Sequence, residues 1–99
     1  MNMQALMKQA QAMQKNMLAA KNKIDNTEFE GDSELVTIKM NGRRDVLSVK
    51  IKNDVSLETD DLEILEDMFS IALKNVLSKI DKEIEEKLGK QTGGLGGLF

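Results

Sequence analysis

Hydrophobic residues near the start of the chain recur at alternating steps of three and four positions. This spacing is typical of the a and d positions of a heptad, which form one apolar seam along a helix. The segment is rich in Ala, Leu, Met, Gln and Lys and contains no Gly or Pro, which favours a helix over residues 2–25. The seam consists of Met3, Leu6, Ala10, Met13, Met17, Ala20 and Ile24.

Apolar and polar residues then alternate singly, which is the pattern of half-buried β-strands. Three such stretches lie at about residues 27–31, 34–40 and 45–52. Val36, Ile38 and Met40 share one face of the second strand. The third strand places its own apolar residues on one face, and these are Leu47, Val49 and Ile51.

Asn41-Gly42 between the last two strands is a strong signal for a tight turn. A loop of two or of four residues would bring the apolar faces of both strands together. The four-residue loop is preferable because it pairs Ile38 with Leu47, whereas the shorter loop pairs Ile38 with Asp45. The sequence therefore predicts an antiparallel hairpin with one buried face.

A second apolar stripe with helical spacing predicts a long helix at about residues 60–88. Asp60 and Glu63 have capping-box spacing at its start. From Ile80 onward the stripe narrows to one residue per turn, so we expect the first half to join the core and the second half to project. Residues 92–99 include four glycines and predict a flexible tail after a single α+β domain that spans residues 1–91.

The predicted helices cannot cover every apolar position of a three-stranded sheet and bury their own seams as well. A homodimer would bury these seams between two chains. The alternative is a monomer whose first helix packs along the second. The residues predicted for the dimer interface are Met3, Leu6, Ala10, Met13, Met17, Ile80 and Ile84.

The composition argues against catalysis. The chain has no Cys, His, Trp, Tyr or Pro, which removes most side chains used for nucleophilic and acid–base chemistry. Its acidic residues crowd a helix N-terminus, where they complement the helix dipole, and no phosphate-binding glycine loop precedes a helix. We therefore expect no enzyme, cofactor, metal site or small-molecule substrate. The first 24 residues are too polar for a signal peptide, and no run is long enough for a membrane span, which favours the cytoplasm.

Charge is distributed unevenly along this weakly acidic chain of net charge −3. The first 24 residues carry four lysines and no acid, whereas residues 57–88 carry ten acids and four lysines. Lysines beside Gln and Asn suit contacts with the phosphates of duplex DNA, although a solvated helix face has the same composition. Without exposed aromatic residues for stacking, we expect weak sequence preference and strong salt dependence. The candidate DNA-binding residues are Lys8, Lys15, Lys21 and Lys23.

Several motifs together resemble the YbaB/EbfC nucleoid-associated protein family. They are Leu6-Met7-Lys8-Gln9-Ala10-Gln11-Ala12-Met13-Gln14, Glu28-Phe29-Glu30-Gly31, Leu35-Val36-Thr37-Ile38, Asn41-Gly42, Val49-Lys50-Ile51, Leu65-Glu66-Asp67, Ala72 and Thr92-Gly93-Gly94-Leu95. One departure is Lys74-Asn75-Val76, where relatives often have Asn-Asp-Ala, and it adds charge and bulk.

The resemblance implies a small bacterial protein of the cytoplasm and nucleoid that is not an enzyme. It also implies a tweezer-like homodimer, with an antiparallel sheet and protruding helices, that binds DNA. An alternative function remains open, in which the projecting helices and the Leu/Phe tail recruit a protein partner.

Overall fold

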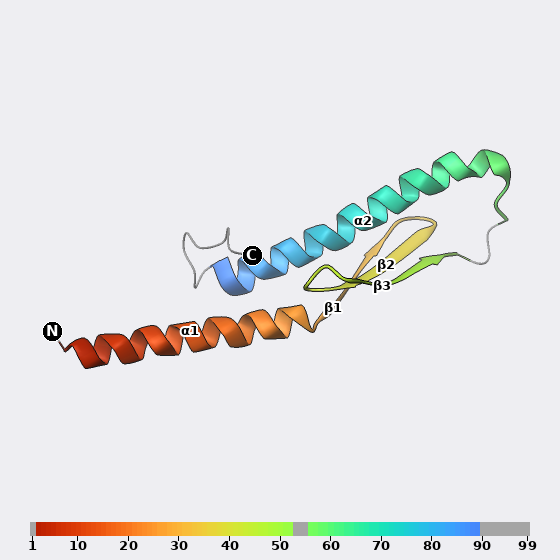
Figure 1. Cartoon of the computed structure of the whole chain (residues 1–99). Coiled ribbons are helices and arrows are strands. Elements are labelled where there is room, and N and C mark those ends of the chain that lie inside the picture. Colours follow the sequence, from red (N-terminus) through yellow and green to blue (C-terminus); the bar gives the residue numbers. More distant parts are fainter. Residues whose placement is uncertain (1, 53–55, 90–99) are drawn as a thin grey trace.

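The computed structural model describes residues 2–52 and 56–89, and its architecture is the predicted one (Figure 1). An N-terminal helix is followed by three antiparallel strands and a long second helix, which confirms the predicted α+β class. The predicted tail at residues 92–99 lies outside the described residues. The elements are α1 (Met3–Asp25), β1 (Glu28–Asp32), β2 (Val36–Asn41), β3 (Val46–Ile51), η1 (Thr59–Asp61), α2 (Leu62–Ile84) and the π-helical turn η2 (Glu85–Gly89).

The strands pair in the order β1-β2-β3, and the β2–β3 register differs from the predicted one. Ile38 lies opposite Val49, not Leu47, and Met40 lies opposite Val46. The backbone N–H of Asn41 donates to Asp45 O at 3.1 Å, and this bond encloses a loop of three residues. A loop with an odd number of residues would by itself turn the apolar residues of β3 to the sheet face opposite to the apolar residues of β2. A β-bulge between the Met40–Val46 and Lys39–Ser48 pairs adds one residue to β3. This extra residue returns Val49 and Ile51 to the same sheet face as Ile38 and Val36.

The predicted capping box at the start of the second helix is wrong. Its spacing is displaced by two residues, since the N–H of Glu58 donates to Asp61 Oδ2 at 2.9 Å. Asp61 is also the N-cap residue of α2, where its side chain makes no capping hydrogen bond to the helix. The single turn η1 before α2 accounts for the displacement.

The core lies between α2 and the sheet face formed by β1 and β2. Gly31 on β1 allows the close approach, since a Cβ there would lie 2.4 Å from Ala72 O and 2.7 Å from Val76 Cβ. The bulk of Val76 is therefore accommodated opposite a glycine. The residues of this core cluster are all at most 4 % exposed, and they are Val36, Ile38, Met40, Ala72, Val76 and Ile80.

The part of the second helix before Ile80 joins the core as predicted, through Ala72 and Val76, but the part from Ile80 onward does not project. Ile80 on α2 and Leu88 on η2 are at most 1 % exposed, whereas Phe69 and Ile71 nearer the start of α2 are 41 % and 45 % exposed. The physical reason is that the end of α1 contacts η2 and covers the second half (Figure 1). α2 packs on β1 and β2, so the first half has no cover on its β3 side.

α1 is the projecting element of the molecule. It meets α2 and η2 only near its own C-terminal end, and its N-terminus lies far from the sheet (Figure 1). The described chain measures 71 × 20 × 15 Å and has a radius of gyration of 19.2 Å, against about 13 Å for a compact domain of this length. One chain alone therefore leaves much of its apolar seam in contact with water.

Candidate nucleic-acid interface

The projecting part of α1 is a regular helix that presents its side chains to solvent. Asn2 caps it, since Asn2 Oδ1 accepts a hydrogen bond from the N–H of Gln4 at 3.0 Å. Residues 2–16 are all exposed. The lysines in this part therefore stand on a surface that no other described element covers.

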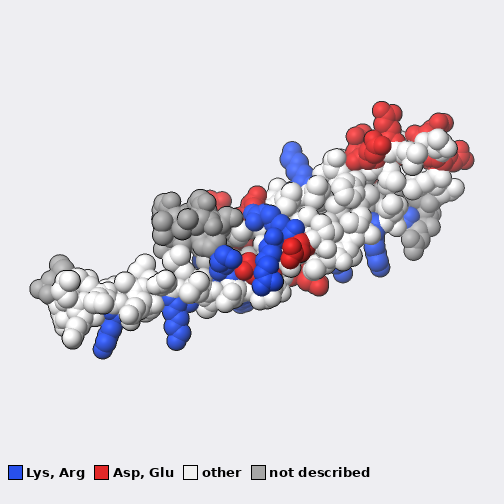
Figure 2. Space-filling view, viewed as in Figure 1, with Lys and Arg blue, Asp and Glu red and all other residues white. Residues whose placement is uncertain are grey.

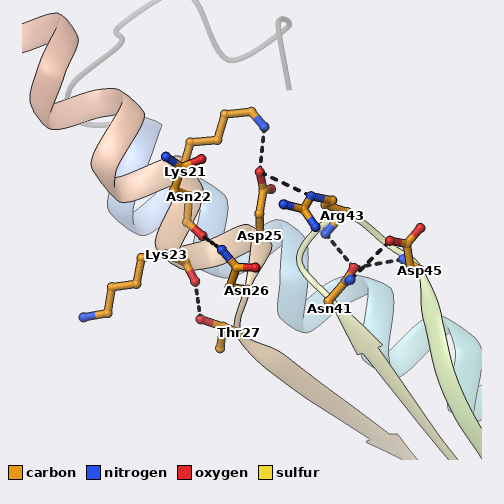
Figure 3. A network of polar contacts seen from close by, with 9 residues as sticks. All are labelled: Lys21, Asn22, Lys23, Asp25, Asn26, Thr27, Asn41, Arg43 and Asp45. Carbon is orange, nitrogen blue, oxygen red and sulfur yellow. Dashed lines mark hydrogen bonds and ion pairs between the residues drawn. The ribbon is translucent and has the colours of Figure 1, made fainter.

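The end of α1 is held by side chains that bond the last carbonyl groups of the helix (Figure 3). Asn26 Nδ2 donates to Asn22 O at 2.8 Å, and Thr27 Oγ1 donates to Lys23 O at 2.5 Å. The second bond satisfies a carbonyl that the helix terminus leaves unpaired, whereas Asn22 O also accepts the backbone N–H of Asn26 at 3.2 Å. The two side-chain bonds position the backbone of Lys23, whose side chain points away from Lys21 in Figure 3.

The structure separates the four predicted DNA-binding lysines into two groups. Lys8, Lys15 and Lys23 are exposed, and none of the described residues forms an ion pair with them. Lys21 is half-buried, and its Nζ lies 3.0 Å from Asp25 Oδ2. At 3.6 residues per turn, Lys21 also lies about 120° around the helix from Lys15. Lys21 therefore belongs to the junction between α1 and the hairpin more than to the exposed lysine face.

Asp25 at this junction also attracts an arginine of the β2–β3 turn, since Arg43 Nε lies 3.9 Å from Asp25 Oδ2. Arg44 Nη2 lies 2.5 Å from Asp81 Oδ1 on α2. The turn itself is ordered by Asn41, whose Oδ1 accepts from the N–H groups of Arg43 and Asp45 at 2.9 and 3.0 Å. Both arginines therefore neutralise acids of the same chain.

The charges of the molecule are separated in space as well as in sequence (Figure 2). Lys and Arg side chains project along the lower edge of the view, over α1 and under the sheet, with some acidic side chains between them, while a larger group of acids gathers over the N-terminal end of α2. That end carries Glu58, Asp60, Asp61, Glu63, Glu66 and Asp67. A polyanion would be attracted to the lysine edge and repelled from the acidic end.

The sequence analysis missed one group of basic residues, on the sheet face turned away from α2. Lys39, Lys50 and Lys52 line a shallow hollow there together with Thr37 and Ser48. The signal was present in the alternation of the strands, because these lysines occupy the polar positions between the apolar ones. Single lysines on a polar strand face are common, so the alternation alone does not distinguish a binding surface.

The predicted dimer-interface residues have different environments. Met3, Leu6, Ala10 and Met13 are exposed, while Met17 and Ile84 are half-buried. Ile80 must be corrected: its side chain is 0 % exposed within the core of its own chain, so it has no surface for a second chain. Its position in the apolar stripe is compatible with a core residue or with an interface residue. It is a core residue because the sheet and the end of α1 cover this part of α2.

An apolar groove that the sequence analysis did not predict lies between β3 and α2. It has a volume of about 510 Å³. It exists because the apolar face of the sheet continues from β2 onto β3, beyond the edge of α2. Val49, Ile51 and Phe69 along it are 41–44 % exposed. The groove is lined by Val36, Val49, Ile51, Leu65, Glu66, Phe69 and Ser70.

Other kinds of site receive no support from residues 2–52 and 56–89. No three acidic residues in these ranges are close enough to hold a metal ion. No helix in the described ranges is long and apolar enough to cross a membrane.

Comparison with known proteins agrees with the features described. The model of the YbaB/EbfC DNA-binding family matches residues 1–95. A nucleoid-associated protein of Lactococcus lactis subsp. lactis is 47 % identical over 97 residues, which cover 96 % of this chain and 97 % of the relative. A nucleoid-associated protein of Clostridium perfringens is 44 % identical over 102 residues, which cover 99 % of this chain and 90 % of the relative. The crystal structure of an uncharacterized Helicobacter pylori protein shares the fold, with a TM-score of 0.70, 19 % identity and 95 % and 99 % coverage.

Proposed function

Because this chain belongs to the YbaB/EbfC DNA-binding family, we propose that it is a nucleoid-associated protein that binds duplex DNA as a homodimer. The observation that carries this proposal is the exposed lysine face of α1, with Lys8, Lys15 and Lys23 unpaired among the described residues. In a chain of net charge −3, such a cluster gives one surface an attraction for phosphate that the whole molecule lacks.

The contact is directed at the DNA backbone and has little sequence preference. Lysine contacts phosphate as a point charge and releases counterions, and this contribution is the same for every sequence. The commonest contact that reads guanine in the major groove is a bidentate Arg side chain on a docked helix. α1 carries no arginine. Binding of this kind influences nucleoid organisation or transcription over long stretches of DNA, and it places the protein at the nucleoid in the cytoplasm.

The homodimer is proposed from the two apolar surfaces that one chain leaves uncovered. The first is the seam of α1, where Met3 is 71 % and Met13 is 51 % exposed. The second is the groove between β3 and α2, which continues the buried face of the sheet. Exposed apolar surfaces of this extent are unusual for a monomer, and a second copy presents the same surfaces in self-complementary form.

Replacing Lys8, Lys15 and Lys23 with Ala tests the DNA contact. Binding to random duplex DNA is measured over a range of salt concentrations. The slope of log affinity against log salt should become shallower by roughly 0.9 for each lost phosphate contact. The matched control is the triple variant K74A/K82A/K87A, which removes the same charge from α2 and η2 and should keep the slope. Equal slopes for wild type and the α1 variant would refute the assignment of these lysines.

A protein-interaction module is the second candidate function. It is favoured by Met7 and Leu18, which are 59 % and 57 % exposed on α1 and lie outside the seam. The Leu/Phe tail that this alternative also invoked lies outside the described residues. Stoichiometric recovery of one protein from nuclease-treated lysate, together with no DNA binding at physiological salt, would favour this candidate over DNA binding.

A further inference from the structure

The outer face of the sheet, turned away from α2, carries a second cluster of lysines. Lys39 on β2 lies opposite Ser48 on β3, and Lys50 lies opposite Thr37. Lys52 follows Lys50 two residues later, and the N–H of Lys52 donates to Leu35 O at 3.0 Å, which keeps it beside the sheet. The three lysines line a hollow of about 370 Å³.

Lys50 is a diagonal neighbour of Lys39 and lies two residues from Lys52, and none of the three lysines forms an ion pair within the described residues. Residues two apart on a strand, and diagonal residues on adjacent strands, are separated by about 7–8 Å. This is within the Debye length of about 8 Å at physiological ionic strength, so the charges repel one another. Within the described ranges, no hydrogen bond or ion pair involves the side chain of any of the three.

Acidic residues of β1 lie on the same sheet face and offset part of this charge, without forming ion pairs with the three lysines. Glu30 on β1 lies opposite Lys39 in the register and also lines the hollow, but no ion pair joins them. Asp32 accepts a hydrogen bond from Thr37 Oγ1 at 2.8 Å. The positive charge is therefore concentrated on the β2–β3 side of the face, where the hydroxyl of Ser48 lines the same hollow and is a suitable donor to phosphate oxygens.

We propose that Lys39, Lys50 and Lys52 form a second phosphate-contacting surface, which binds duplex DNA together with the lysine face of α1. This inference rests on the proposed function and extends its contact surface onto the sheet. Figure 2 supports it, since basic side chains project along the same edge of the molecule over α1 and under the sheet. A polyanion on this surface relieves the repulsion among the lysines and releases counterions at the same time.

The test compares K39A/K50A/K52A with wild type in salt titrations on random duplex DNA. The slope of log affinity against log salt should be shallower by roughly 0.9 for each lysine removed, or about 2.7 per chain. K39R/K50R/K52R keeps the charges and should retain the wild-type slope. K74A/K82A/K87A again serves as the control for net charge. Circular dichroism and sedimentation of each variant establish that the fold and the oligomeric state are unchanged.

The outcomes separate this inference from the proposed function. If wild type and the α2 control bind duplex DNA and K39A/K50A/K52A binds with the same slope, the sheet surface is refuted while the proposed function stands. If wild type does not bind duplex DNA, both are refuted. The inference would also be overturned if K39A/K50A/K52A changed the slope of log affinity against log salt on duplex RNA but not on duplex DNA. The sheet surface would then bind a different nucleic acid.

Discussion

Two glycines determine how closely the helices approach the sheet. A Cβ at Gly31 would lie 2.4 Å from both Ala72 O and Val76 N, which are backbone atoms of α2. A Cβ at Gly42 would lie 2.1 Å from Ile24 O at the end of α1. Neither contact can be relieved by moving a flexible side chain. Each glycine thus brings a helix into contact with the sheet or its turn, and the sequence alone marks only Gly42, as part of a turn.

Gly31→Ala should destabilise the fold by about 1–3 kcal/mol, because the added methyl group displaces α2 from β1. Urea denaturation followed by circular dichroism measures the free energy of unfolding. Gly89→Ala is the matched control, since a Cβ there is 3.5 Å from the nearest side-chain atom of Glu85. It should leave stability unchanged or raise it slightly. Equal stability of both variants would contradict the close packing of α2 on Gly31.

At the scale of elements, local patterns predicted what each segment forms but not how the segments cover one another. The helix predicted for residues 2–25 is observed as Met3–Asp25, since its composition and heptad spacing are local properties. The β2–β3 register was missed because the bulge that restores its parity at Leu47 has no signal of its own in the sequence. The environments of the two halves of α2 depend on where α1 ends, which is a tertiary property.

The groove between β3 and α2 gives the element-scale prediction. Ile51→Glu and Phe69→Glu should each weaken the proposed dimer on the order of 100-fold or more, because burying an unpaired carboxylate costs several kcal/mol. Both side chains are exposed in the single chain, so the fold should persist. Analytical ultracentrifugation over a concentration series measures the association. Leu18→Glu, at an exposed apolar site outside the groove and the seam, is the control.

A dimer that survives both groove substitutions would contradict the groove as an interface. Met13→Glu on the seam of α1 then decides whether the dimer uses that seam instead. A chain that is monomeric as wild type at concentrations well above those used for DNA binding would refute the homodimer itself.

At the scale of the whole molecule, the elongated shape and the separated charges belong together. A compact fold would bring the α1 lysines close to the acids of α2 and cancel their attraction for a polyanion. In the 71 Å long chain, a basic edge and an acidic end coexist (Figure 2). The charge asymmetry along the sequence predicted the basic surface on α1. The sheet contribution required the fold, since Lys39 and Lys50 come together only when β2 and β3 pair.

The central claim is that this protein binds duplex DNA through lysine–phosphate contacts with little regard to sequence. The most direct measurement is the affinity of the wild-type protein for two duplexes of unrelated sequence, titrated from low to physiological salt. The account predicts linear plots of log affinity against log salt with steep negative slopes that agree between the two duplexes. A slope near zero, a strong preference for one duplex, or no binding even at low salt would contradict it.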